Sequence, residues 1–265
     1  MSELLIAGIL GLVQGITEFL PISSTGHMII VGELIGFTGD RAATFEICIQ
    51  LGSILAVVVI YAQRFFGLIH PRPGVRFAGR HGIFLLFLTF LPAAVAGLLT
   101  HGLIKKHLFS STTVCLALVA GALYIFFVER RERRPTACSL DEITPALALG
   151  IGIFQCLALW PGFSRSAATI MGAMLLGVQR KTAAEYSFIA AVPVMVAATG
   201  YELLSSAGHL DTTDISLFAT GFAVAFITAW VAVKTFISLV SRISLRPFAI
   251  YRIILAGVVF FWLVK

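Results

Sequence analysis

The first residues that could perform chemistry together lie near the start of the chain. Gln14 and Glu18 are four residues apart, so both side chains fall on one face of a helix. A turn rich in hydroxyl groups follows directly, with Pro21, Ser23, Ser24, Thr25, Gly26 and His27. A carboxylate can activate a neighbouring hydroxyl as a general base, and an imidazole can move a proton at neutral pH. An acid, several hydroxyl groups and an imidazole therefore converge in this segment.

A second group of polar residues occurs in the other half of the chain, directly after a Pro-Gly pair. It consists of Ser164, Arg165, Ser166 and Thr169. A guanidinium surrounded by hydroxyl donors suits the oxygens of a phosphate group. We therefore expect this segment to bind phosphate.

The composition shows which solvent surrounds these groups. Hydrophobic residues make up 58% of the chain and charged residues only 12%, and the mean hydropathy is +0.98. These values exclude an ordinary soluble domain and predict an all-α polytopic membrane protein embedded in a lipid bilayer. The net charge of +6 comes largely from loops, so we expect no nucleic-acid partner.

Several apolar stretches are long enough to cross a hydrocarbon core, which takes roughly 20 residues. We expect about six transmembrane helices, one of them opened by Glu185 and the others at 47–63, 83–104, 108–128, 215–233 and 247–264. Arg252 lies within one of these apolar stretches and Lys234 directly follows another, each close to the predicted cytosolic end of its span. We expect both side chains to reach the membrane surface and to take no part in chemistry.

The two polar groups interrupt apolar segments that are too short to be simple spans. Residues 4–17 run into the break at 21–27, and residues 143–160 run into the break at 161–166, which a short apolar arm at 167–178 follows. We interpret each as a re-entrant helical hairpin. Irregular backbone survives at membrane depth only where protein or water lines it, so both breaks should face an internal cavity.

The two breaks have similar spacings, which suggests an internal repeat. Pro21 precedes Ser24 by three residues, as Pro161 precedes Ser164. We therefore pair Ser24 with Ser164. Interrupted segments at corresponding positions of two halves are a good indication of a binding site at the middle of the membrane.

The repeat defines the domain organisation. We predict one integral membrane domain, 1–265, with repeats at about 1–130 and about 140–265 in inverted topology. Glu46 and Glu185 follow the two breaks, and we expect each to open an apolar helix. Each glutamate either caps its helix or ligates the site, where it would contact the residues that bind the substrate.

The loop charges predict the orientation in the membrane, because short cytoplasmic loops are rich in Lys and Arg. Segments 63–82, 129–142 and 241–246 are strongly basic and should face the cytosol. Segment 201–214 is acidic and contains neither Lys nor Arg, so it should lie outside. The N-terminus is then also outside.

The two motifs, 14–27 and 161–169, closely resemble the two signatures of the bacterial undecaprenyl pyrophosphate phosphatase family, also called bacitracin resistance proteins. The resemblance extends to 44–52 and 155–160 and so covers nearly the whole chain. Many family members have Glu where this chain has Gln14, so Gln14 is better interpreted as an orienting amide than as a base.

The resemblance implies hydrolysis of undecaprenyl pyrophosphate to undecaprenyl phosphate and inorganic phosphate. This reaction recycles the lipid carrier of cell-wall synthesis at the outer face of the bacterial plasma (inner) membrane. By motif position, Glu18 is the base or a metal ligand, and Ser24 is the nucleophile or positions a water. His27 is the acid or an alternative nucleophile, and Arg165 clamps phosphate. Substrate-binding positions are Gln14, Ser23, Thr25, Gly26, Ser164, Ser166 and Thr169.

Some of these residues also have structural interpretations. His27 could hydrogen-bond within its own turn, and Ser23, Ser166 and Thr169 could satisfy backbone groups that the breaks expose. The resemblance also implies assistance by Mg²⁺ or another divalent cation, with Glu18 as one candidate ligand, although the sequence shows no cage of protein ligands. The sequence carries no signal for or against a homo-oligomer.

A transporter or flippase for a phosphate-bearing lipid or solute is the alternative from another functional class. Inverted breaks would serve it equally well. A carrier, however, has no need of a hydroxyl beside both a carboxylate and an imidazole, and this combination favours the enzyme.

Overall fold

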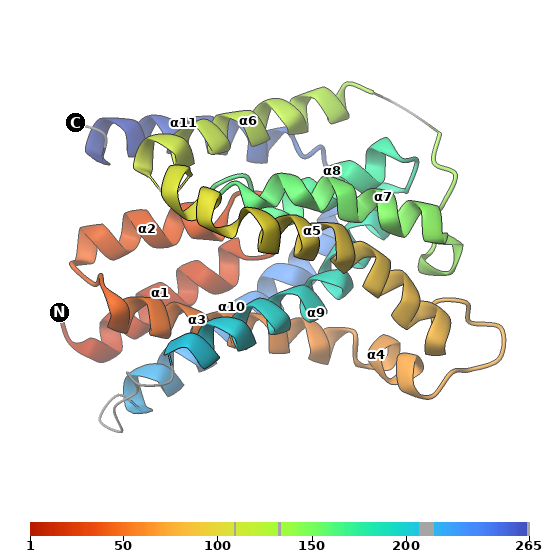
Figure 1. Cartoon of the computed structure of the whole chain (residues 1–265), viewed down its shortest axis with the longest axis horizontal. Helices are drawn as coiled ribbons and strands as arrows, with labels where there is room; N and C mark the ends of the chain where they lie inside the picture. Colours follow the sequence, from red (N-terminus) through yellow and green to blue (C-terminus); the bar gives the residue numbers. More distant parts are fainter. Residues whose placement is uncertain (109, 132–133, 207–214, 264–265) are drawn as a thin grey trace.

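The computed structural model describes the chain except for residues 109, 132–133, 207–214 and 264–265. Its regular elements are helices, which confirms the predicted all-α fold of a polytopic membrane protein (Figure 1). In chain order they are α1 (Glu3–Thr17), α2 (Ser24–Ile35), α3 (Asp40–Ile60), α4 (Ala62–Ile69), α5 (Gly79–His107), α6 (Ser111–Glu129), η1 (Leu140–Glu142), α7 (Pro145–Gln155), η2 (Cys156–Leu159), α8 (Arg165–Leu175), α9 (Arg180–Ser206), α10 (Ile215–Val240) and α11 (Arg246–Leu263).

Helices that are long and apolar enough to cross a membrane occur at five places in the described part of the chain. They are Arg41–Ile60, Gly79–Ile104, Ser111–Glu129, Arg180–Gly200 and Ile215–Val240. They match five of the predicted spans. Helix α11 covers the sixth, whose last predicted residue lies outside the described residues, so this span stays a prediction. The predicted outer loop lies partly in 207–214, which is also outside them.

Close helix packing sets the position of α1, the helix that ends at the first break. Gly11 and Gly15 face α10, and a Cβ atom at Gly15 would lie only 2.6 Å from the carbonyl oxygen of Ala225. Thr228 Oγ1 donates a hydrogen bond to the carbonyl oxygen of Gly11 at 3.4 Å. Small residues let two backbones approach in this way inside a membrane. The end of α1 is therefore held firmly against the opposite half of the chain.

The second hairpin uses the same device. Gly152 on α7 faces α5, where a Cβ atom would lie 2.6 Å from the carbonyl oxygen of Thr89. Gln155 Nε2 donates to that same oxygen at 3.2 Å. Each hairpin thus packs on a long helix of the other half, while α3 contacts α9 and α6 contacts α11. This exchange supports the internal repeat, whose boundaries and inverted topology stay predictions.

The three basic segments lie near one another, and α4 in Figure 1 belongs to the first of them: Ser244 Oγ of the third segment donates to Glu129 Oε2 of the second at 2.7 Å. The N–H of Phe77 donates to Asp141 Oδ1 at 2.7 Å, and Arg180 pairs with Glu129 at 2.9 Å. The N-terminus lies at the end of the molecule opposite α4 (Figure 1). A common end for the basic segments is what the predicted orientation requires.

The expected starts of two helices were wrong. Glu46 lies inside α3, which begins at Asp40, and Glu185 lies inside α9, which begins at Arg180. Neither glutamate is in the first turn, so neither caps its helix. The charged and polar residues before each glutamate continue the helix, because nothing there breaks it.

Candidate active site

The first break has an unusual backbone at the start of α2. Ser23 is the N-cap, with φ 72° and ψ 96°, and its side chain accepts a hydrogen bond from the N–H of Gly26 at 3.3 Å. L-amino acids disfavour this region, and holding one there costs on the order of 1–3 kcal/mol. Such strain persists only where the surrounding structure enforces it, and it is common at functional sites.

The second break repeats this geometry. Ser164 is the N-cap of α8, with φ 77° and ψ 117°, and accepts from the N–H of Ala167 at 3.3 Å. Ser23 and Ser164 are the non-glycine residues with positive φ in the described chain. The pairing of Ser24 with Ser164 was therefore wrong by one residue. Spacing from the preceding proline is not a measure of turn geometry, because Pro21 precedes its N-cap by two residues and Pro161 by three.

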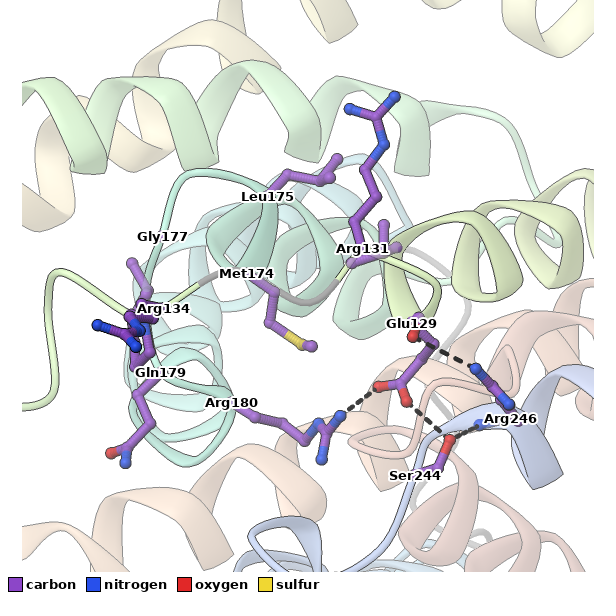
Figure 2. A pocket seen from close by; sticks show the side chains of 13 residues that line it. Glu129, Arg131, Arg134, Met174, Leu175, Gly177, Gln179, Arg180, Ser244 and Arg246 are labelled. Carbon is purple, nitrogen blue, oxygen red and sulfur yellow. Dashed lines mark hydrogen bonds and ion pairs between the residues drawn. The ribbon is translucent and has the colours of Figure 1, made fainter.

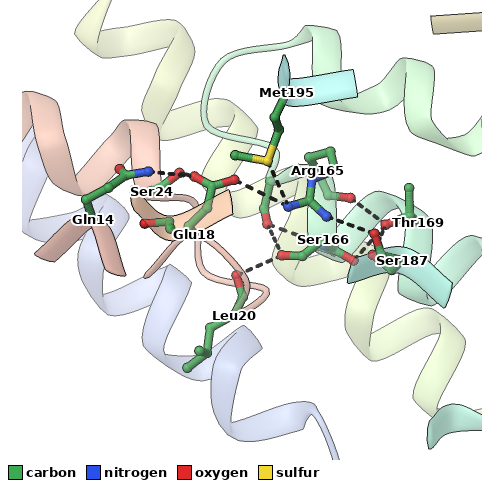
Figure 3. Close-up of polar contacts among 12 residues, drawn as sticks. Gln14, Glu18, Leu20, Ser24, Arg165, Ser166, Thr169, Ser187 and Met195 are labelled. Carbon is green, nitrogen blue, oxygen red and sulfur yellow. Dashed lines mark hydrogen bonds and ion pairs between the residues drawn. The ribbon is translucent and has the colours of Figure 1, made fainter. Parts of the chain in front are cut away.

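The corrected pairing makes Ser24 and Arg165 equivalent first residues of their helices, and both contact Glu18. Ser24 Oγ donates to Glu18 Oε2 at 2.7 Å, and Arg165 Nη2 donates to Glu18 Oε1 at 3.3 Å. Figure 3 shows the carboxylate between the two side chains. One carboxylate thus joins the hydroxyl of one break to the guanidinium of the other.

Gln14 completes the surroundings of this carboxylate. Its Nε2 donates to Glu18 Oε2 at 3.0 Å, across one turn of α1. Glu18 is 9% exposed and the Arg165 side chain 14%. Charges this far from water are retained only when they are paired and hydrogen-bonded. The position of Gln14 agrees with its interpretation as an orienting amide.

Arg165 has donors beyond its bond to Glu18. Nη1 donates to the carbonyl oxygen of Ser187 at 3.3 Å, and Nη2 lies 3.6 Å from the sulfur of Met195. Nε is buried and has no hydrogen-bond partner in the described structure. A buried donor without a partner costs free energy, so it is well suited to receive an anion. The start of α8 adds backbone N–H groups that favour negative charge.

The other hydroxyls of the second break contact backbone and one another. Ser166 Oγ donates to the carbonyl oxygen of Leu20 at 2.8 Å and lies 3.0 Å from Ser164 Oγ. Thr169 Oγ1 donates to the carbonyl oxygen of Arg165 at 2.9 Å. Ser166 and Thr169 are fully buried. Their contacts fit the structural interpretation, since they satisfy backbone groups at the break.

The other predicted site residues have no described contact with Glu18, Ser24 or Arg165. Thr25 is exposed at the start of α2, and Gly26 is buried behind it. Glu46 is half-buried within α3. Glu185 lies 4.0 Å from Lys181 on its own helix. The structure describes no hydrogen bond from Glu185 to the Glu18 cluster.

His27 is held within its own turn. Nδ1 lies 2.7 Å from the carbonyl oxygen of Ser23, which can only accept, so Nδ1 carries the proton. In the neutral ring Nε2 then accepts from the hydroxyl of Tyr251 at 2.6 Å. Among the described contacts, none joins His27 to Glu18, Ser24 or Arg165 directly. The ring instead orients the backbone beside Ser24.

Arg252 is the residue that the sequence interpretation missed. Its side chain does not reach the membrane surface but is fully buried. It donates to the carbonyl oxygens of Pro21 at 3.3 Å and Gly162 at 3.0 Å, one in each break, and to those of Ala117 and Leu118. Breaks inside hydrocarbon expose carbonyl groups that need donors, and one guanidinium supplies several. A charge within an apolar span was the signal that could have revealed it.

The described residues contain no cluster of three or more His, Cys, Asp or Glu side chains that could hold a metal. Mg²⁺ is commonly held by one or two carboxylates together with the phosphate groups of a substrate. Glu18 fits such a partial site as a single ligand. The chemistry of the donors therefore suits a cation that a phosphate-bearing ligand would largely coordinate.

The fold and the site together define a polytopic membrane protein with a buried carboxylate, hydroxyl and guanidinium held between two broken helices. The sequence profile of the family described as bacitracin resistance protein BacA matches residues 7–258. The chain belongs to this family.

Full-length relatives carry a common name. The undecaprenyl-diphosphatase of Nitratidesulfovibrio vulgaris (strain DP4) is 63% identical over 263 residues, which cover 99% of each chain. That of Maridesulfovibrio salexigens is 62% identical over 99% of this chain and 100% of its own. The undecaprenyl-diphosphatase 1 of Bacillus thuringiensis (strain Al Hakam) is 52% identical over 97% of each chain.

Proposed function

We propose that this protein is a membrane-embedded hydrolase that converts undecaprenyl pyrophosphate to undecaprenyl phosphate and inorganic phosphate. Its relatives over the full length are undecaprenyl-diphosphatases. The observation that carries the proposal is the carboxylate of Glu18, which accepts a hydrogen bond from the Ser24 hydroxyl on one oxygen and from Arg165 on the other. A base within hydrogen-bond reach of a hydroxyl, beside a phosphate-binding cation, is the arrangement that phosphoryl transfer needs.

In the proposed reaction Ser24 Oγ attacks the terminal phosphorus of the substrate while its proton passes to Glu18 Oε2. The bond from that phosphorus to the bridging oxygen breaks, and the bridging oxygen leaves with undecaprenyl phosphate. Water then hydrolyses the phosphoserine, which releases inorganic phosphate and restores the hydroxyl. A phosphate leaving group has a second pKa near 6, so its departure needs little help from an acid.

The positive charge of Arg165 serves the transferring phosphoryl group. When the substrate enters, its oxygens replace Glu18 at Nη2 and occupy the free Nε donor, so the fork of the guanidinium binds two oxygens. Glu18 is thereby released to act as the base. A divalent cation bound to the pyrophosphate would share its charge and take Glu18 as a ligand. His27 holds the Ser23 carbonyl and so orients Ser24.

The direct test is release of inorganic phosphate from undecaprenyl pyrophosphate by the purified protein in detergent. We expect turnover by the parent, and a loss of roughly 10²-fold or more in Glu18→Ala, Ser24→Ala and Arg165→Ala. His27→Ala should lose activity as well, because the helix start that carries Ser24 loses its support. Ser238→Ala, an exposed serine on α10, is the matched control and should keep full activity.

No turnover by a well-folded parent, with or without Mg²⁺, would contradict the enzyme. Activity of Ser24→Ala equal to that of Ser238→Ala would contradict the site. Turnover in detergent needs no second compartment, so the same assay separates an enzyme from a carrier.

The identity of the nucleophile has its own test. Rapid acid quenching with substrate labelled in the terminal phosphate should trap a phosphoserine at Ser24, with a burst of undecaprenyl phosphate. A burst-free reaction without labelled protein would instead assign the attack to a water that Ser24 positions.

We further propose that the protein lies in the bacterial plasma membrane with the basic end in the cytosol and the active site open to the outer side. Support comes from the common end of the basic segments. Cys138 is exposed at that end and provides a native probe. A thiol reagent that cannot cross membranes should label it only after permeabilisation. Thr38 is exposed between α2 and α3, at the end that carries the N-terminus, so Thr38→Cys in a Cys138→Ser background should be labelled in intact cells. The reverse pattern would overturn the orientation.

A further inference from the structure

A cavity of about 680 Å³ lies at the basic end, away from the Glu18 site. It is bordered by the end of α6 and the residues that follow it, by the turn between α8 and α9, and by residues at the start of α11. Its apolar lining includes Val128 and Met174, and Figure 2 shows the Met174 side chain between the polar groups. A space of this size is within the range of small-molecule sites.

Glu129 organises one wall of the cavity. Its side chain is only 3% exposed and accepts from Arg180 Nη2 at 2.9 Å and from Ser244 Oγ at 2.7 Å. Arg246 Nη2 donates to the backbone oxygen of Glu129 at 3.5 Å. Arg180 Nη1 also donates to the carbonyl oxygen of Ile243 at 3.3 Å. The charge of Arg180 is thus neutralised and its position is set.

The other arginines of the lining have no such partner. Within the described chain, no carboxylate lies within ion-pair distance of Arg131, Arg134 or Arg246, and all three side chains are exposed. Figure 2 shows Arg134 across the cavity from Arg246. Among the described residues of the lining, Glu129 is the one carboxylate, and it is already bound to Arg180. The described lining therefore carries a positive excess of three guanidinium groups that long side chains can direct at one anion.

An apolar groove lies beside the cavity on the surface of α6. Its volume is about 370 Å³, and Leu123, Phe126 and Phe127 line it together with Arg130 and Arg131. Arg131 borders both spaces, and its guanidinium lies 4.4 Å from the centre of the Phe127 ring. Leu123 is 59% exposed within a helix that spans the membrane. The groove therefore faces lipid and ends in positive charge.

We propose that this cavity binds an anionic phospholipid, with the headgroup phosphate among Arg131, Arg134 and Arg246 and the start of one acyl chain in the groove. Basic pockets beside membrane helices bind anionic headgroups in this way. A free phosphate ion would use the arginines but not the groove. Arg131 borders both spaces, so a headgroup phosphate beside it has an apolar groove next to it, and this favours a lipid.

This site is separate from the active site, although two helices reach both. Arg165 starts α8, and Met174 near its other end lines the cavity, roughly 14 Å further along at 1.5 Å per residue. Arg246 starts α11, which also carries Tyr251 and Arg252. The proposal does not depend on hydrolysis, because its ligand and its residues are different.

The test is a lipid titration of the purified protein, followed by native mass spectrometry. The parent should bind dioleoylphosphatidylglycerol at least tenfold more tightly than dioleoylphosphatidylcholine. The triple variant Arg131→Gln/Arg134→Gln/Arg246→Gln should lose roughly 100-fold in affinity for the anionic lipid, because each surface arginine contributes about fivefold. Arg180 and Glu129 are left unchanged, since their pair supports the fold.

The matched control is Arg72→Gln/Arg76→Gln/Arg80→Gln, which removes the same charge from exposed positions at the same end. It should change the affinity less than threefold. Leu123→Gln should weaken the lipid severalfold, and millimolar inorganic phosphate should not displace it. Equal losses in the two triple variants would overturn the proposal in favour of general surface charge. Displacement by inorganic phosphate, or no preference for the anionic lipid, would overturn it as well.

Discussion

The two breaks share a backbone and differ in the side chain that follows the N-cap. Ser23 and Ser164 have nearly the same positive φ, 72° and 77°, and each accepts from an N–H three residues later. After them the first break presents Ser24, a short hydroxyl, and the second presents Arg165, a long cation. Both reach Glu18, on opposite oxygens. One local structure thus presents a hydroxyl on one side and a guanidinium on the other, which are the proposed nucleophile and the proposed phosphate clamp.

The residues four positions after each N-cap also differ between the two breaks. His27 in the first break contacts Ser23 and Tyr251, whereas Ala168 occupies the corresponding place in the second break and is fully buried. The first break therefore contains the groups that can move protons. The second is packed tightly around a single charge, which fixes the position of Arg165.

Arg252 holds both breaks, so removing it should have the largest effect. Arg252→Met leaves the carbonyl oxygens of Pro21 and Gly162 without donors, and we expect the free energy of unfolding to fall by about 3–5 kcal/mol. Activity should fall as well, because the backbone of both breaks is no longer held in position. Thermal unfolding in detergent measures the change. Lys234→Met, an exposed cation over the ring of Trp230, is the control and should cost less than about 1 kcal/mol.

Glu18 is the point at which the two breaks meet, and its loss should separate them. In Glu18→Gln the hydroxyl of Ser24 loses its base, and we expect kcat to fall by roughly 10²-fold or more. The double variant with Ser24→Ala should be little worse than either single change, because the pair acts as a unit. Glu33→Gln, on the exposed side of α2, should leave kcat unchanged. Multiplying losses in the double variant would show that Glu18 and Ser24 act independently.

Arg165→Lys alters only the second break. The charge remains but the planar fork is lost, so we expect KM to rise about tenfold while kcat changes less. Ser24→Ala should do the opposite and lower kcat. Steady-state kinetics on both variants therefore distinguishes a clamp from a nucleophile. Arg41→Lys, in an exposed pair with Glu3, is the matched control. If Arg165→Lys lowered kcat and left KM unchanged, Arg165 would not be the phosphate clamp.

The smallest effects compare the two N-caps directly. Ser23→Ala and Ser164→Ala each lose a cap and keep a positive φ, so each should cost about 1 kcal/mol or more in unfolding free energy. Glycine tolerates this backbone, so Ser23→Gly and Ser164→Gly should cost only a few tenths. Thermal unfolding of the four variants tests whether the breaks are equivalent. A site at which alanine is tolerated better than glycine would not have the strained turn.

Much of the architecture was predictable because it depends on short stretches of sequence. Long apolar runs without charge must span the membrane as helices. A helix must end where Pro-Gly or Pro-Ile-Ser interrupts such a run. The motifs around Glu18, Ser24 and Arg165 identified these side chains, because a carboxylate, hydroxyls and a guanidinium so close to apolar helices are costly to keep without a use.

The sequence by itself determined which segments cross the membrane, where they break and which polar residues the breaks carry. Only the tertiary structure decided which of these residues meet. Ser24 and Arg165 reach the same carboxylate, and Arg252 reaches Pro21 and Gly162, because helices from both halves pack closely through small residues. Residue spacing within one segment carries no information on such contacts. They depend on how distant helices fit together.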